Sequence, residues 1–164
     1  LQTCNYSNKQ GAIDMFSRKL LIPFIFLFCS NAIADGHKHV VKMLNMGQEG
    51  PMVFEPAYIK IKKGDVVVFA MTDKGHNAVS IASPSGGPEF DTKYAPSTEV
   101  KFDVEGIYFY KCTPHAIMGM AGFIEVGNTS NKDEMKAAVD KFESGVMVPN
   151  AKGRMLKTFE ANVK

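Results

Sequence analysis

Tryptophan is absent from this chain of 164 residues, cysteine occurs only three times, and the charges nearly balance, with 19 basic and 17 acidic residues. Three scattered cysteines exclude a small domain held together by several disulfides. The near-neutral charge argues against a general nucleic-acid binder. The apolar run at 20–29 is shorter than the about 20 residues that cross a bilayer, which argues against a many-span membrane protein. With 45% hydrophobic and 22% charged residues, the composition is typical of one globular domain.

The first 34 residues have the pattern of an export signal. Two basic residues precede the apolar run at 20–29, and small residues precede a cut after Ala34, which predicts a secretory signal peptide over 15–34. A retained membrane anchor is the alternative. We expect residues 1–14 to be an upstream extension or an artefact, and residues 35–164 to form a single domain.

Removal of this segment changes the charge and the cysteine count. Residues 1–34 contain three basic residues and one acidic residue, so 16 of each remain and the remainder has no net charge. Cys4 and Cys29 are also removed, which leaves Cys112 alone. A single thiol in an oxidising compartment needs a specific reason to be there.

The central part of the chain has the pattern of strands. Short runs rich in Val, Ile, Phe and Tyr are separated by Gly, Pro, Asp and Asn. Val100 and Phe102 alternate with Lys101 and Asp103, as in a strand with one buried face. We therefore expect residues 35–128 to form an all-β sandwich or barrel of about eight strands. The predicted strands are 40–45, 52–55, 58–61, 65–71, 78–81, 99–103, 107–111 and 122–126.

The composition changes after Gly127, and residues 129–164 are predicted to be helical. Asn131 begins a helix-start pattern, and apolar residues follow at helical spacing up to Gly145. A second helix is predicted over 150–161, with Gly153 as a weak point in its first turn. Two helices this short are marginal alone in water, so we expect them to pack on the sandwich.

A loop between the last two predicted strands carries Cys112, His115 and Met120 at the spacing Cys-x2-His-x4-Met. A thiolate, an imidazole and a thioether can bind one ion from such a loop, and soft sulfur ligands favour copper. The electron-transfer copper geometry requires a second histidine, which His76 can supply. Met118 is the alternative to Met120 as the weak axial ligand. Other methionines are expected to be core residues: Met43, Met71, Met135, Met147 and Met155.

These motifs resemble the pseudoazurins, a branch of the cupredoxin family of blue copper proteins. The ligand loop alone would also suit plastocyanin, but Phe54-Glu55-Pro56-Ala57-Tyr58 and the two predicted C-terminal helices favour the pseudoazurins. The matching segments are 43–45, 52–60, 73–77, 111–115 and 118–120.

The resemblance implies a Greek-key β-sandwich with two short α-helices packed on it. It implies one type 1 copper ion, held by His76, Cys112, His115 and Met120, in an electron-transfer protein that is not an enzyme. It further implies a periplasmic protein that receives electrons from a donor such as a cytochrome. The acceptor would be a reductase such as the nitrite reductase of denitrification. We expect a monomer with no membrane span after processing and no nucleic-acid partner.

Other residues near the motif are expected to support the site. Asn77 can tie the two ligand loops together by hydrogen bonds, and Pro114 removes a backbone donor near the Cys112 sulfur. An ordinary turn Asn and loop Pro are the alternatives. By analogy with the family, Met52 packs on the His115 ring, although a core role is an equal alternative.

Two lysines directly precede the ligand segments, namely Lys74 and Lys111. We expect His115 to present its ring edge to solvent as the electron port, with these lysines steering an acidic patch of a redox partner toward it. Solvated surface lysines without a docking role are the alternative.

Cleavage after Ala34 would create the amino terminus Asp35-Gly36-His37. A free α-amine with histidine third can bind Cu(II) or Ni(II) in a square-planar set of nitrogens. The alternative is a polar terminus without metal.

Two further functions compete with the electron carrier. Cys112 and a histidine could form a thiol nucleophile and its base, although this leaves Met120 unused. The same ligands could instead serve a copper carrier or storage protein that transfers no electrons.

Overall fold

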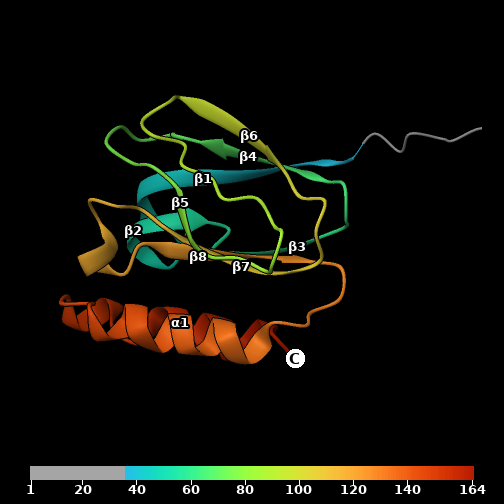
Figure 1. Cartoon of the computed structure of the whole chain (residues 1–164). Helices are drawn as coiled ribbons and strands as arrows, with labels where there is room; N and C mark the ends of the chain where they lie inside the picture. Colours follow the sequence, from blue (N-terminus) through green and yellow to red (C-terminus); the bar gives the residue numbers. More distant parts are fainter. Residues whose placement is uncertain (1–35) are drawn as a thin grey trace, which may run out of the picture. The chain divides into compact units, whose positions relative to one another are not determined.

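The computed structural model describes residues 36–164. The predicted signal peptide at 15–34, the extension at 1–14 and Asp35 lie outside the described residues. Eight strands form two four-stranded sheets, followed by two α-helices (Figure 1), which confirms the predicted fold class. The elements are β1 (Lys38–Gly47), β2 (Gly50–Glu55), β3 (Tyr58–Ile61), β4 (Val66–Ala70), β5 (Val79–Ala82), β6 (Ser97–Lys101), β7 (Gly106–Lys111), η1 (Ala116–Met118), β8 (Ala121–Val126), α1 (Lys132–Ser144), η2 (Pro149–Ala151) and α2 (Arg154–Asn162).

The chain passes repeatedly between the two sheets. The first sheet has the strand order β2-β1-β4-β6, and the second has the order β3-β8-β7-β5. Most neighbouring strands are antiparallel, whereas β1 pairs with β4 and β3 pairs with β8 in parallel. This interleaving is that of a Greek-key sandwich, and it places the β4–β5 and β7–β8 connections where both can contribute to one site.

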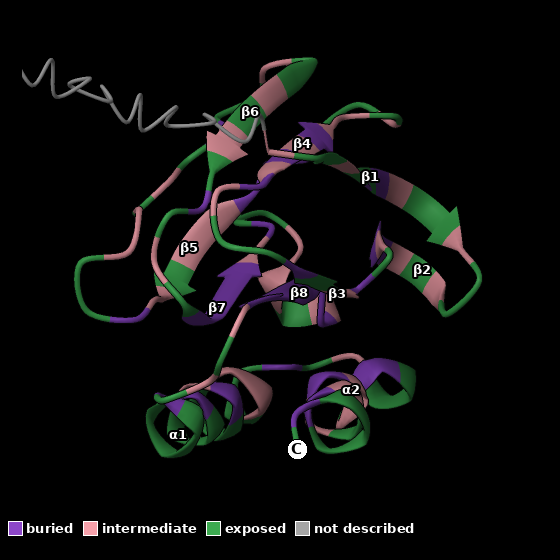
Figure 2. Ribbon diagram, turned by 90° about the vertical axis from the view of Figure 1, so that its right-hand side faces the viewer, coloured by how far each residue is buried: buried purple, intermediate pink, exposed green. Residues whose placement is uncertain are grey.

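Strand β7 is buried almost throughout because its two faces belong to two different cores. Successive side chains of a strand point to opposite faces. Tyr108 and Tyr110 therefore lie between the sheets, while Ile107 and Phe109 face the helices. Figure 2 shows β7 and β8 as buried strands, with α1 and α2 side by side across from them. The buried residues of the two helices are Met135, Val139, Met155 and Phe159.

Most strand boundaries are shifted slightly from the sequence-based expectations. The following differences have a clear physical cause. Strand β6 spans Ser97–Lys101 rather than the predicted 99–103, because its pairing with β4 covers these residues. Helix α2 begins at Arg154, because Gly153 has a left-handed φ of 75° that interrupts the predicted helix. Met147 is 73% exposed instead of buried, since it lies in the connection between α1 and η2. Over residues 36–164, none of the helices combines the length and apolar character needed to cross a membrane.

Candidate metal centre

The predicted ligands come from two connections between strands. His76 lies between β4 and β5, and the other three lie between β7 and β8. The second connection is closed at its base, because the backbone N–H of Cys112 donates to the carbonyl of Met120 at 3.0 Å. The N–H of Met120 donates in turn to the carbonyl of His115 at 3.2 Å. These bonds fold the ligand loop back on itself and turn its donor side chains toward the His76 loop.

Three donor atoms converge at one place. The Nδ1 atoms of His76 and His115 are 3.1 Å apart, and the Sγ atom of Cys112 lies 3.7 Å and 3.4 Å from them, respectively. Within residues 36–164, these three side chains are the one cluster of His, Cys, Asp or Glu groups that could hold a metal ion. Two imidazole nitrogens and a thiolate sulfur fit copper.

The structure favours Met120 over Met118 as the fourth ligand. Met120 is completely buried and belongs to the same core cluster as Cys112. Met118 is only half-buried and lies in η1, outside that cluster. A fully buried thioether in the same core cluster as the thiol can serve as the weak axial ligand of a site of this type.

Asn45 orients His76, and sequence reasoning missed it. Its Oδ1 lies 3.0 Å from Nε2 of His76, so the proton of the neutral ring belongs on Nε2 and the lone pair on Nδ1 faces Cys112. Burial lowers the pKa of His76, the nearby His115 lowers it further, and Asp73 partly opposes them. The ring is therefore neutral near pH 7, the form that binds a metal.

The Cys112 thiol is fully buried. Burial raises its pKa, and hydrogen bonds from the backbone N–H groups of Asn77 and His115 offset part of that effect. Without a metal, the thiol therefore keeps its proton near pH 7. A bound cation displaces that proton and makes the thiolate the stable form.

The residues predicted to support the site differ in their contacts and in their burial. The side chain of Asn77 accepts from the N–H of Thr113 at 2.7 Å and donates to its hydroxyl at 3.1 Å, so it links the two ligand loops. Pro114 is exposed. Met52 is half-buried and packs against the core cluster that contains Cys112 and Met120.

His115, the predicted electron port, and the two predicted docking lysines differ in their exposure to solvent. His115 is half-buried, whereas His76 is completely buried. Lys74 is exposed, and Lys111 is half-buried at the end of β7.

The described part of the predicted amino-terminal site is His37 with Gly36. The backbone N–H of His37 donates to Oδ1 of the buried Asp65 at 2.9 Å. A square-planar nitrogen site would use this same backbone nitrogen as a ligand, and would have to break that hydrogen bond.

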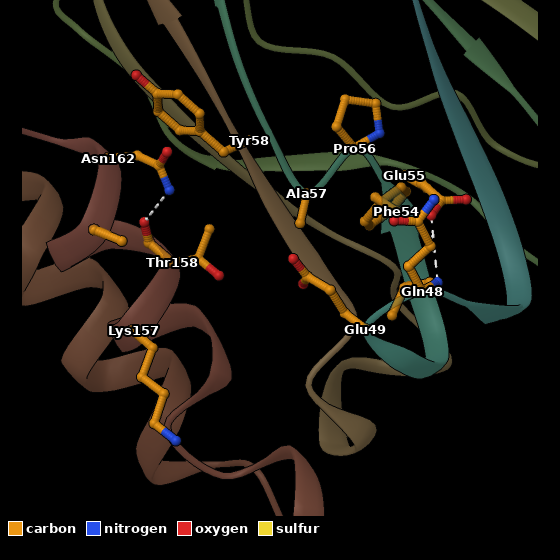
Figure 3. Close-up of a pocket in the computed structure, with 12 residues that line it drawn as sticks. Gln48, Glu49, Phe54, Glu55, Pro56, Ala57, Tyr58, Lys157, Thr158 and Asn162 are labelled. Carbon is orange, nitrogen blue, oxygen red and sulfur yellow. Dashed lines mark hydrogen bonds between the residues drawn. The ribbon is translucent and has the colours of Figure 1, made fainter.

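A separate hollow of about 570 Å³ lies between the segment from β2 to β3 and helix α2 (Figure 3). Its lining includes Glu55, Tyr58, Thr158 and Asn162. None of the four predicted ligands lines it, so this hollow is distinct from the metal centre.

Comparison with known proteins gives consistent matches. Residues 41–127 match the family described as copper binding proteins, plastocyanin/azurin family. The chain is 39% identical to the pseudoazurin of Paracoccus pantotrophus over 127 residues, which cover 76% of this chain and 88% of that protein. It is 45% identical to the pseudoazurin of Methylorubrum extorquens over 100 residues, 60% of this chain and 66% of that one. The crystal structure of pseudoazurin from Methylobacterium extorquens AM1 aligns with a TM-score of 0.66 at 36% identity, over 77% of this chain and 99% of that one.

Proposed function

This chain belongs to the pseudoazurins, within the plastocyanin/azurin family of copper-binding proteins, and we propose that it is a periplasmic electron carrier. Its acceptor would be a reductase such as nitrite reductase. The observation that carries the proposal is the convergence of two imidazole nitrogens and one buried sulfur. This donor set is typical of electron-transfer copper sites.

The chain's own contribution is to hold the ligands still. When bound, copper supplies a one-electron change between Cu(I) and Cu(II). Asn45 fixes the ring of His76, and the Asn77–Thr113 pair joins the two ligand loops. Ligands fixed in this way change position little between the two oxidation states, which favours rapid electron transfer.

His115 is the proposed electron port because it is the one of the two histidine ligands that is partly exposed. Lys74 and Lys111 place positive charge beside the ligand segments. An acidic patch on the partner reductase would be attracted to this surface, and association would slow as the salt concentration rises.

The buried thiol argues against the enzyme alternative. A nucleophilic cysteine needs an accessible thiolate, whereas Cys112 is fully buried and burial raises its pKa. A copper carrier or storage protein would use the same ligands, and only a redox measurement separates it from an electron carrier.

The central experiment adds Cu(II) to the purified metal-free protein and records the visible spectrum and a voltammogram. Intense blue colour with reversible reduction supports the electron carrier. Copper binding without reversible reduction supports a copper carrier or storage protein. Absence of copper binding would contradict all copper-dependent functions.

The partner proposal is tested by stopped-flow mixing of the reduced protein with a copper nitrite reductase. The double variant Lys74→Glu with Lys111→Glu should slow association at low salt and leave the copper spectrum unchanged. The matched control is Lys62→Glu with Lys63→Glu, which changes two exposed lysines in the connection between β3 and β4. Equal rates for both double variants would contradict the docking role.

The periplasmic location is proposed from the predicted signal peptide at 15–34. Fractionation of expressing cells and sequencing of the mature amino terminus test it. A mature chain that begins at Asp35 supports the proposal, and an uncleaved cytoplasmic chain contradicts it.

A further inference from the structure

The C-terminal segment holds the backbone of the ligand loop. Three consecutive carbonyls at 117–119, directly before Met120, all accept hydrogen bonds from it. The first accepts from the backbone N–H of Met147 at 2.8 Å. The second and third accept from Nη2 of Arg154 at 3.2 Å and 2.8 Å. The position of Met120 therefore depends on residues that lie beyond the β-sandwich in the sequence.

Arg154 also binds the first sheet. Its Nη1 donates to the carbonyl of Pro51 at 3.2 Å, and its Nη2 also lies 3.0 Å from the carbonyl of Met52. Since Nη2 carries two hydrogens and faces three carbonyls, one of its N–H groups is shared between two of them. One guanidinium thus connects strand β2 with the ligand loop. The group is planar, with several N–H donors in fixed directions, so it can hold several carbonyls in a definite arrangement. A lysine, with one compact ammonium, cannot reproduce this arrangement.

Arg154 is itself held in place from helix α1. Oε2 of Glu143 accepts from the N–H of Gly153 at 2.7 Å, and Oε1 accepts from the N–H of Met155 at 2.7 Å. This carboxylate satisfies free N–H groups at the beginning of α2, on both sides of Arg154. The side chain of Arg154 therefore starts from a backbone that is fixed to α1.

The ligand loop lies close against the C-terminal segment at Gly119. A Cβ atom there would lie 3.1 Å from Cβ of Ala151, and Gly119 has a left-handed φ of 73°. Both facts favour glycine at this position. The backbone of the loop therefore packs directly on the segment that carries Arg154.

We propose that Arg154 is a positioning residue for the axial ligand, and that the C-terminal helices set the properties of the copper site through it. The inference rests on the proposed function, because it takes Met120 as a ligand of redox-active copper. In an electron-transfer copper site the axial thioether bond is weak and long, so with copper bound its length would depend on where the backbone holds Met120. Gly119 is bonded directly to Met120, so a shift of its carbonyl shifts the ligand.

The test compares Arg154→Lys and Arg154→Met with the unchanged chain. The first measurement is amide hydrogen exchange at Gly119 and Met120 in the metal-free protein. Both variants should exchange about tenfold faster there, which corresponds to about 1.4 kcal/mol, the size expected for one hydrogen bond to a charged group. With copper bound, the intensity ratio of the visible absorption bands and the reduction potential should both shift. Lys157→Met is the matched control, since it removes an exposed cation from the same helix.

Arg154 variants with unchanged exchange, band ratio and potential would overturn the inference. If both variants fail to fold, Glu143→Gln decides, because it keeps the guanidinium and removes one of the carboxylate acceptors at the start of α2. Faster exchange at Gly119 and Met120 in Glu143→Gln, by less than tenfold, supports the inference, and unchanged exchange overturns it. Failure of the unchanged chain to form a blue copper site would overturn the proposed function, while exchange in the metal-free chain would still test the role of Arg154.

Discussion

Replacement of Asn45 by alanine tests how the chain prepares His76 for the metal. The substitution removes the partner of Nε2, at 3.0 Å, from a histidine that is completely buried. The backbone at this position should stay in place, because the N–H of Asn45 donates to Oδ2 of Asp73 at 2.7 Å in either case. The change therefore isolates one contact of the ligand ring.

The magnitude follows from burial. A buried donor left without a partner costs about 1–3 kcal/mol. Asn45 itself is exposed, so water can reach the vacated position, and the lower part of that range applies. We expect a loss of about 1.4 kcal/mol, which is about tenfold in copper affinity and at the lower end of the effects of outer partners of metal-binding histidines.

The assay is competition for copper against a chelator of known affinity, followed by the visible absorption. Asn45→Asp keeps an acceptor oxygen at the same position and should recover most of the affinity. Asn128→Ala, an exposed change after β8, controls for the loss of an amide side chain. Equal copper affinity of Asn45→Ala and the unchanged chain would refute the argument that this hydrogen bond prepares the ligand.

Three further predictions concern stability and stoichiometry. Asn131→Ala should lower the free energy of unfolding by about 2–4 kcal/mol in urea titrations, because the buried N–H and carbonyl of Ile107 both lose their partner, whereas Asn128→Ala should have little effect. Burial acts to raise the pKa of Asp65, but hydrogen bonds from backbone N–H groups and a histidine ring hold it below the ordinary 3.8. Its carboxylate therefore stabilises the fold fully above about pH 4, and this contribution is lost as the pH falls through the lowered pKa. In thermal unfolding at pH 7, Asp65→Asn should unfold at a lower temperature than the unchanged chain, and in acid the two unfolding temperatures should become similar. A chain that begins at Asp35 should bind one copper by metal analysis, because an amino-terminal site would break a hydrogen bond to Asp65, and two coppers would show that this site forms.

Much of the fold could be read from local patterns. The alternation around Val100 and Phe102 predicted a strand with one buried face. In β6 (Ser97–Lys101) Thr98 and Val100 are half-buried, and Phe102, directly after the strand, is fully buried. The apolar spacing after Asn131 predicted α1. Each pattern arises because one side of the element packs against a core, so apolar residues recur with the period of the strand or the helix.

The helix start at Asn131 shows where local reasoning stopped. The residue stands directly before α1, where an asparagine commonly caps a helix with its side chain. Here the side chain pairs instead with the backbone of Ile107 in β7. Local sequence placed the boundary of the helix, whereas the packing of α1 against the second sheet decided what the side chain binds.

The sequence by itself determined the donor types of the candidate metal centre, because Cys112, His115 and Met120 lie in one short loop, where the covalent chain keeps them close together. Only the tertiary structure decided which groups hold them in place. Asn45 meets His76, and Arg154 meets the carbonyls beside Met120, through contacts between residues 31 to 36 positions apart in the sequence. Such partners depend on strand pairing and helix packing, which bring distant residues together without leaving any period or spacing in the sequence.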